Sequence, residues 1–332
     1  MTRPPDSGGL EGVLVVSKPP GPTSHDVVAL IRRLSGTRRV GHGGTLDPFA
    51  SGVLPLFLGG ATRLVEYHLG DRKGYRATIC FGARSSTDDL DGELTPVTGP
   101  PVDSAAVSAA LAALQGEIRQ RPPVFSAIQV GGRRSYALAR QGVPPALADR
   151  IVVIHELELV AWNADDPARP IAVVDVQCSA GTYVRALARD LGAAIGNGAY
   201  LCALVRTSSG PFRLADAVSL DQLRAGAGEG PAGLLPFLLP ADAGLDDLPS
   251  VRLTPDEIRD AGMGRFIRPV AGVGEGRSGV PMRLLDPGGR IVGIGTLDGH
   301  RIAPAKMLAP HRDPGESMGD PDGSDAARHL DA

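Results

Sequence analysis

The sequence has little cysteine, few aromatic residues and no long apolar run. Only 4% of its 332 residues are aromatic, and the three cysteines lie far apart without a C-x-x-C pair. Such cysteines are typical of reduced core thiols in a reducing compartment, so we expect neither a disulfide nor a zinc site. No apolar run approaches the ~18 residues that span a bilayer, and the first residues, MTRPPDSGGLEG, lack an apolar signal core. We therefore expect a cytoplasmic protein without a membrane segment.

An overall positive charge is also missing, because the formal net charge is −3. The distribution of charge is more informative. Residues 311–332 carry six acidic residues against two arginines, whereas residues 12–84 carry ten basic residues against four acidic ones, and residues 117–150 carry six against two. A polyanion responds to such local basic faces more than to the sum. The sequence is thus compatible with a nucleic-acid partner, and it predicts a disordered acidic tail over 311–332.

The most informative stretch that is present is VGHGGTLDPFASGVLPLFL, residues 40–58. It places the carboxylate of Asp47 after three glycines and before Pro48. Glycine allows close backbone approach and proline stiffens the turn, so the pattern favours an aspartate held in a preorganised loop as nucleophile or base. A tight turn with a solvated aspartate is the alternative. Phosphate binding is set aside, because the P-loop pattern requires Gly-Lys-Ser/Thr and Gly44 precedes Thr-Leu-Asp.

Residues 41–56, GHGGTLDPFASGVLPL, resemble the catalytic-aspartate motif of the tRNA pseudouridine synthase B family, whose members isomerise a uridine in the T-loop of tRNA. Further stretches are similar to motifs of that family: KPPGPTSHDVV (18–28), KGYRATICF (73–81), GTYVR (181–185) and AYLCALVRTSSGPF (199–212). The resemblance implies an α+β pseudouridine synthase fold, with a central, mostly antiparallel sheet flanked by helices. The reaction needs no redox step or energy input, so we expect no cofactor and no metal.

The resemblance implies three catalytic residues. Asp47 is the expected nucleophile, and whether it attacks C6 of the base or C1′ of the sugar stays open. Arg185 is expected to keep Asp47 ionised, because an opposite charge lowers the pKa of a carboxylate. Tyr75 is expected to stack on the flipped uracil and to be able to abstract a proton. The residues alone favour a simpler interpretation, in which Tyr75 is a core aromatic of a strand and Arg185 is a surface residue of a helix.

The resemblance also implies a substrate-binding set around these residues. Its members are His42, Tyr183, Leu204, Lys18 and Arg206. His42 and Tyr183 are expected to contact the flipped nucleotide or its neighbours, Leu204 to line the uracil pocket, and Arg206 to lie on the RNA side. Lys18 belongs to the stretch that supports the catalytic loop in this family. A polar loop residue facing water remains the alternative for His42.

The chain is expected to divide into four parts. A flexible segment, 1–11, precedes a catalytic domain over 12–245, and a PUA-like RNA-binding domain over 250–310 precedes the tail. Within the catalytic domain, residues of about 120–150 resemble a thumb-like insertion that grips the T-loop; Phe125 and Gln129 stand where the family has tyrosine and lysine. The acidic loop SSTDDLDGE, 85–93, lacks an EF-hand spacing and is expected to be solvated.

These observations predict an isomerase that forms pseudouridine at position 55 of tRNA. The expected partner is the T-stem-loop of tRNA, and the expected state is a monomer. Two alternatives remain open. One is a pseudouridine synthase that acts on other RNA within a guide-RNA particle, and the other is a non-catalytic RNA-binding or tRNA-folding protein.

Overall fold

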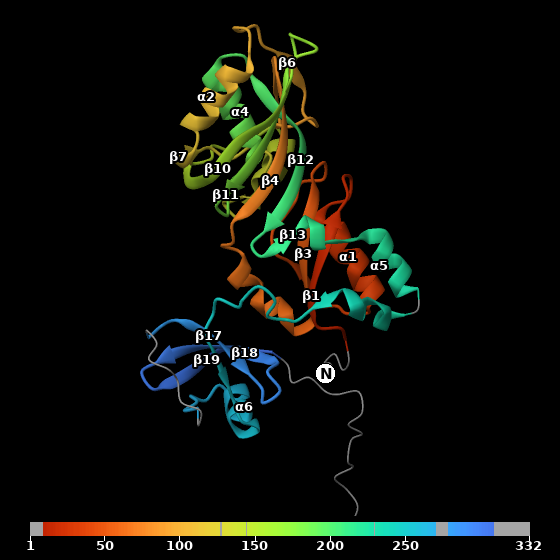
Figure 1. Cartoon of the computed structure of the whole chain (residues 1–332), viewed down its shortest axis with the longest axis vertical. Helices are drawn as coiled ribbons and strands as arrows, with labels where there is room; N and C mark the ends of the chain where they lie inside the picture. The colour runs from red at the N-terminus through yellow and green to blue at the C-terminus, as the bar shows by residue number, and fades with distance from the viewer. Residues whose placement is uncertain (1–8, 127, 144, 229, 270–277, 309–332) are drawn as a thin grey trace, which may run out of the picture.

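The structure, a computed structural model, describes residues 9–126, 128–143, 145–228, 230–269 and 278–308. Figure 1 shows an elongated body built on one large sheet and, below it, a small sheet with the helix α6 (Pro255–Gly262). The tail predicted over 311–332 and most of the predicted flexible amino-terminal segment lie outside the described residues. No helix among the described residues combines the length and the apolarity that crossing a membrane requires.

In the part of the chain that the structure describes, the large sheet has eleven strands, with the main order β14-β1-β3-β12-β4-β11-β10-β7. Its strands are β1 (Gly12–Lys18), β2 (Val40–His42), β3 (Ser51–Leu58), β4 (Lys73–Phe81), β7 (Gly116–Gln120), β10 (Arg150–Asn163), β11 (Ile171–Cys178), β12 (Ala199–Ser209), β13 (Phe212–Arg213), β14 (Val218–Ser219) and β15 (Leu238–Leu239). Along the main order, only the pairs β1–β14 and β3–β12 are parallel. The prediction of a mostly antiparallel central sheet is confirmed.

Helices pack against this sheet at both ends. The helices of this part of the chain are α1 (Ser24–Ser35), α2 (Ser104–Ala113), α3 (Ser135–Arg140), α4 (Val184–Ile195) and α5 (Leu220–Ala227), with 3-10 helices η1 (Gly59–His68), η2 (Leu214–Asp216) and η3 (Pro231–Phe237). Of these, α3 lies within the thumb-like insertion and contacts β9. α2 packs against α4 and β10, and α4 packs against β12. α1 packs against β2 and α5 at the other end.

Two residues set the ends and the packing of the helices near the site. Thr23 caps α1 and forms a capping box with Asp26. The helix α4 continues past Gly192 to a left-handed Gly196. Gly192 serves close packing instead, because a Cβ there would lie 2.1 Å from the nitrogen of Ala199 at the start of β12. The glycine thus lets the helix and the strand approach each other closely.

The cysteines differ from the sequence-based expectation. Cys80 on β4 and Cys202 on β12 form a disulfide, and Cys178 is a free, buried thiol. The two strands are neighbours, and the register shift between Leu201 and Ala203 places Cys202 at an irregularity of β12. The expectation of three reduced thiols is therefore wrong for two of them. Their separation of 122 residues hides this pairing from the sequence.

The thumb-like insertion leaves and re-enters the sheet at one point. Gln120, the last residue of β7, pairs with Arg150, the first residue of β10, and the side chains of Arg121 and Asp149 form an ion pair at 2.8 Å. Inside the insertion, β8 (Gln129–Val130) pairs with β9 (Arg133–Arg134), which α3 follows. A separate hairpin, β5 (Ala83–Ser85) and β6 (Leu94–Pro96), carries the acidic loop. Both excursions approach α4.

The carboxyl-terminal sheet has the order β16-β17-β18-β19. Its strands are β16 (Ser250–Arg252), β17 (Pro281–Leu285), β18 (Ile291–Asp298) and β19 (Arg301–Met307). Thr254 caps α6 in a capping box with Glu257. Ile294 and Leu308 join an apolar cluster that includes Val13 of β1 and Phe57 of β3, so the small sheet shares a core with the large one. Arg283 of β17 forms ion pairs with Asp242 at 3.1 Å and with Asp246 at 3.2 Å, which tie the small sheet to the segment that precedes it.

Candidate active site

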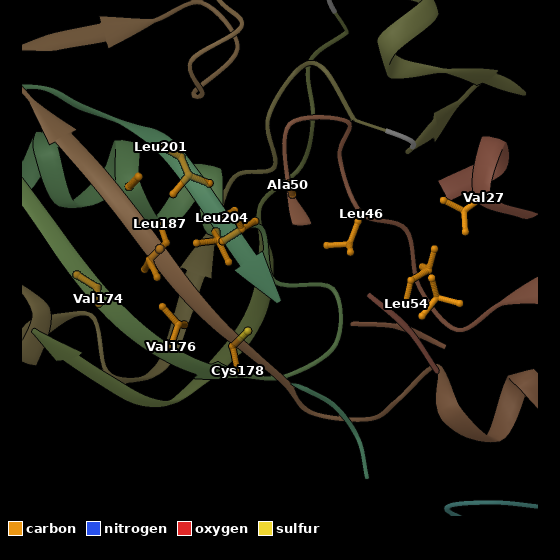
Figure 2. Close-up of a cluster of buried hydrophobic side chains, with 14 of the residues drawn as sticks. Val27, Leu46, Ala50, Leu54, Val174, Val176, Cys178, Leu187, Leu201 and Leu204 are labelled. Carbon is orange, nitrogen blue, oxygen red and sulfur yellow. The ribbon is translucent and has the colours of Figure 1, made fainter. Parts of the chain in front are cut away.

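The loop between β2 and β3 presents Asp47 on an apolar base. Leu46 and Ala50, which flank the aspartate, are 3% and 0% exposed, and Figure 2 shows both beside Leu54 of β3. Ser24 of α1 fixes the loop, because its Oγ accepts from the Leu46 N–H at 2.9 Å and donates to the Leu46 carbonyl at 3.2 Å. The side chain of Asp47 is 36% exposed, so a rigid base carries an accessible carboxylate.

Arg185, in the first turn of α4, forms an ion pair with Asp47. Its Nε lies 3.0 Å from Oδ2 of Asp47, and its Nη1 lies 3.2 Å from Oδ2 of Asp89. It also donates to the carbonyls of Thr87 at 3.1 Å and Phe125 at 2.9 Å. Arg185 is only 5% exposed, and these partners hold its guanidinium in one orientation. The structure thus brings the predicted nucleophile and its predicted cation together.

Asp89 is a member of this cluster that the sequence analysis missed. It is 4% exposed and accepts from the Asp91 N–H and the Thr87 hydroxyl. The expectation that the acidic loop is merely solvated is therefore wrong at Asp89. Burial raises the pKa of Asp47, the carboxylate of Asp89 adds to the rise, and Arg185 opposes it. Asp47 therefore takes up a proton more readily than its ion pair with Arg185 alone would suggest.

Arg206 does not face the RNA side as expected. It is 1% exposed, and it donates to the carbonyls of Val53 at 2.6 Å, Gly44 at 3.1 Å and Thr45 at 3.4 Å. Its position on β12 explains the burial, because the buried Leu204 lies two residues earlier and therefore on the same face. This arginine contacts the loop that carries Asp47, so we revise its role from RNA contact to support.

Lys18 is buried in the same manner, with 0% exposure. Its Nζ donates to the carbonyls of Ala50 at 2.7 Å, Pro19 at 2.9 Å and Pro48 at 3.2 Å. Burial lowers the pKa of Lys18 to about 8, although Asp47 opposes the shift. Its assignment as a substrate contact is wrong, because the ammonium has no open face. Lys18 binds the loop after Asp47, and Arg206 binds the loop before it.

Tyr75 on β4 lies opposite Arg206 on β12 in the strand register, so the phenol is close enough for the charge of Arg206 to act on it. Burial raises the pKa of Tyr75, while Arg206 opposes the rise. The phenol therefore stays protonated near neutral pH, so Tyr75 is a poor general base. The arrangement fits an apolar ring beside the site better than the proton abstraction considered above.

His42 ends β2 and points its ring back at the loop. Its Nδ1 accepts from the Gly44 N–H at 3.3 Å, and His25 packs edge-on against it with ring centroids 5.6 Å apart. Burial lowers the pKa of His42, and the charges of His25 and Arg206 lower it further. A neutral ring suits this contact, because a protonated Nδ1 cannot accept a hydrogen bond.

Tyr183 and Leu204 complete the predicted set. Tyr183 precedes α4; the Gln120 amide bonds both its backbone N–H, at 2.8 Å, and its carbonyl, at 3.1 Å. Gln120 is fully buried, and its role was not visible in the sequence. Leu204 is 7% exposed and belongs to the main core cluster, and Figure 2 shows it near Leu187 of α4. The sequence signal for Gln120 is weak, because only its place at the start of the insertion marks it.

No group of three or more His, Cys, Asp or Glu side chains with a metal-binding arrangement occurs among the described residues. The groups around Asp47 are instead cations and backbone carbonyls, with one further carboxylate, that of Asp89.

Comparisons with known proteins agree with this arrangement. A model of the TruB family pseudouridylate synthase N-terminal domain matches residues 32–184, and a model of the tRNA pseudouridylate synthase B C-terminal domain matches residues 185–246. A tRNA pseudouridine synthase B of Arthrobacter sp. (strain FB24) is 43% identical over 309 residues, which cover 91% of this chain and 97% of the relative. One of Synechococcus sp. (strain WH7803) is 45% identical over 292 residues, covering 87% and 94%.

The fold is also that of a solved structure. A chain in a crystal structure of a Cbf5-Nop10-Gar1 complex superposes with a TM-score of 0.68 at 25% identity, covering 93% of this chain and 92% of that one. The sheet, with a loop aspartate held against a helix arginine, is therefore that of a pseudouridine synthase. The chain belongs to the TruB family of these enzymes. It is an isomerase that converts uridine to pseudouridine in tRNA.

Proposed function

We propose that the target is the uridine at position 55 in the T-loop of tRNA, and that Asp47 is the nucleophile. The observation that carries the proposal is the ion pair of Asp47 with Arg185: the carboxylate is 36% exposed, whereas the guanidinium behind it has a side-chain exposure of 6%. A reactive carboxylate must reach the substrate, and its counterion must not move away when RNA binds. The relatives that are named tRNA pseudouridine synthase B support tRNA as the substrate.

In the proposed reaction a carboxylate oxygen of Asp47 forms a covalent bond with the flipped nucleoside. The bond from N1 of uracil to C1′ of the ribose then breaks, the base turns, and C5 bonds to C1′. Release of Asp47 and loss of the C5 proton complete the isomerisation, while N1 takes up a proton, so no oxidant or reductant is required. Tyr75 supplies a ring face for the unstacked base, and Leu204 bounds the same pocket.

The test is incubation of the purified protein with an unmodified tRNA transcript, followed by mapping of every modified uridine. We expect a single pseudouridine in the T-loop, formed by the protein alone as a monomer acting in the cytoplasm. Modification only in the presence of a guide RNA would favour the alternative of a pseudouridine synthase that acts within a guide-RNA particle. A transcript with the T-loop uridine replaced by cytidine is the control, and it should stay unmodified.

Proton uptake by Asp47 is expected to set the acidic limb of the pH–rate profile. Burial raises its pKa above the ordinary 3.8, so the rate should fall at a higher pH than that of an enzyme with an ordinary aspartate. The ionised form costs folding free energy as pH rises through that raised pKa, so at acidic pH this group favours the fold. Single-turnover rates and melting temperatures over about pH 3 to 8 separate the two effects. An acidic midpoint near 3.8, or no acidic limb, would contradict the assignment.

A further inference from the structure

A second arginine of α4, Arg189, lies one helical turn after Arg185 and faces the same surroundings. Its Nη1 donates to Asp88 at 2.9 Å, its Nε to Asp190 at 2.9 Å, and its Nη2 to the carbonyl of Arg121 at 2.8 Å. Each guanidinium nitrogen therefore has a protein partner, and the side chain is 30% exposed. The residue is therefore engaged in holding other parts of this chain.

The two arginines bind the same two segments, neither of which belongs to α4. Arg185 contacts the acidic loop at Thr87 and Asp89, and Arg189 contacts it at Asp88, between them. At the root of the thumb-like insertion, Arg185 donates to the Phe125 carbonyl and Arg189 to that of Arg121. The contacts of Arg189 with these two segments therefore also hold the groups that orient Arg185.

Asp88 adopts a left-handed backbone conformation, which a non-glycine residue keeps only where its surroundings hold it. Its φ is +63°, the only positive value recorded for a non-glycine residue among those described, and aspartate tolerates this region better than most residues. Its carbonyl accepts from the Leu201 N–H at 3.1 Å, and its carboxylate is bound by Arg189. The next residue is Asp89, so the position of Asp88 determines how Asp89 meets Arg185.

We propose that Arg189 is a positioning residue for the isomerisation, acting with Asp88 and the thumb root. It sets where Asp89 and the Phe125 carbonyl stand, and thereby how Arg185 presents its guanidinium to Asp47. The inference rests on the proposed role of Asp47. It assigns to the thumb-like insertion a second task, because a shift of residues 121–125 on RNA binding is transmitted through both arginines to the reactive carboxylate.

The test compares single-turnover rates and tRNA affinities of Arg189→Gln, Arg189→Lys and the unaltered enzyme. We expect Arg189→Gln to lower the rate about 10- to 100-fold, since small misplacements of catalytic groups have effects of this size, and to leave the dissociation constant for tRNA within about twofold. Arg189→Lys, which keeps the charge beside Asp88, is expected to recover most of the rate. Arg224→Gln breaks an exposed ion pair on α5 and is the matched control, with an unchanged rate.

A double-variant cycle with Asp89→Asn separates positioning from general destabilisation. If Arg189 acts through Asp89, then adding Arg189→Gln to Asp89→Asn should lower the rate by no more than about twofold beyond the single change. Three results would each overturn the proposal. They are a double variant whose loss in rate equals the product of the two single losses, an unchanged rate in Arg189→Gln, and a loss in Arg189→Gln that is confined to tRNA affinity. If Arg189→Gln does not fold, Asp88→Asn, which removes the carboxylate that Arg189 binds on the acidic loop, takes its place in the same cycle. An active Asp47→Asn enzyme overturns the proposed function instead, so the two failures are distinguishable.

Discussion

Replacing Asp47 with asparagine is expected to abolish pseudouridine formation while leaving tRNA binding almost intact. The amide has the shape of the carboxylate but cannot act as a nucleophile, and loss of a nucleophile costs roughly 10⁴-fold or more in rate. The RNA affinity should change by less than about threefold, because phosphate contacts elsewhere on the surface dominate it. Single-turnover conversion of a tRNA transcript and a filter-binding titration measure the two quantities.

The same variant should not be less stable than the unaltered enzyme at neutral pH. Because burial raises the pKa of Asp47, its ionised form is disfavoured in the folded protein, and a neutral amide avoids that cost. Asp221→Asn changes an aspartate whose side chain is 91% exposed and serves as the control, with unchanged activity. Product formation by the Asp47→Asn enzyme at even a hundredth of the normal rate would rule out the proposed nucleophile.

Replacing Arg185 with glutamine is expected to impair both catalysis and folding. Asp47 and Asp89 would then share a site without their common cation, and breaking a buried ion pair costs about 3 kcal/mol of unfolding free energy. The rate should fall about 10³-fold, because the carboxylate loses both its orientation and the charge that keeps it ionised. Urea unfolding and single-turnover rates give the two values.

A second change distinguishes these two losses. In the double variant Arg185→Gln with Asp89→Asn, the uncompensated buried carboxylate of Asp89 is gone, so most of the stability should return while the rate stays low. Arg185→Lys keeps a positive charge but cannot satisfy Asp47, Asp89 and two carbonyls at once, and we expect it to remain at least tenfold slow. An Arg185→Gln enzyme with a rate within a few-fold of normal would contradict the role given to this ion pair.

The sequence predicted the reactive loop and its cation because both lie in motifs that are contiguous along the chain. It also predicted a central, mostly antiparallel sheet flanked by helices, because the same motifs resemble those of a family with that fold. It did not predict that Lys18 and Arg206 are buried, because basic side chains are seldom fully buried. One signal was available: Arg206 alternates in phase with Leu204, and Lys18 with Val16, so each lies on an inward face.

Asp89 shows where sequence reasoning reaches its limit. A run of acidic residues in a loop normally faces water, and only the folded chain brings Asp89 beside an arginine from a distant helix. Gln120 and the pair of Cys80 with Cys202 are similar cases, because their partners lie far away in sequence. What local patterns omit is the long-range pairing of strands and loops, which determines the neighbours of each polar side chain.

The apolar cluster that joins the large sheet and the small sheet, here called the seam, limits where the chain can be shortened. The family models end at residue 246, yet Ile294 and Leu308 cover Val13 and Phe57 from beyond that border. A chain trimmed at the border would present bare apolar surface to water and would aggregate, since exposed apolar patches of this kind associate. The catalytic sheet and the small sheet therefore stabilise each other through this seam, although the small sheet also has an apolar cluster of its own around Leu284 and Ile302.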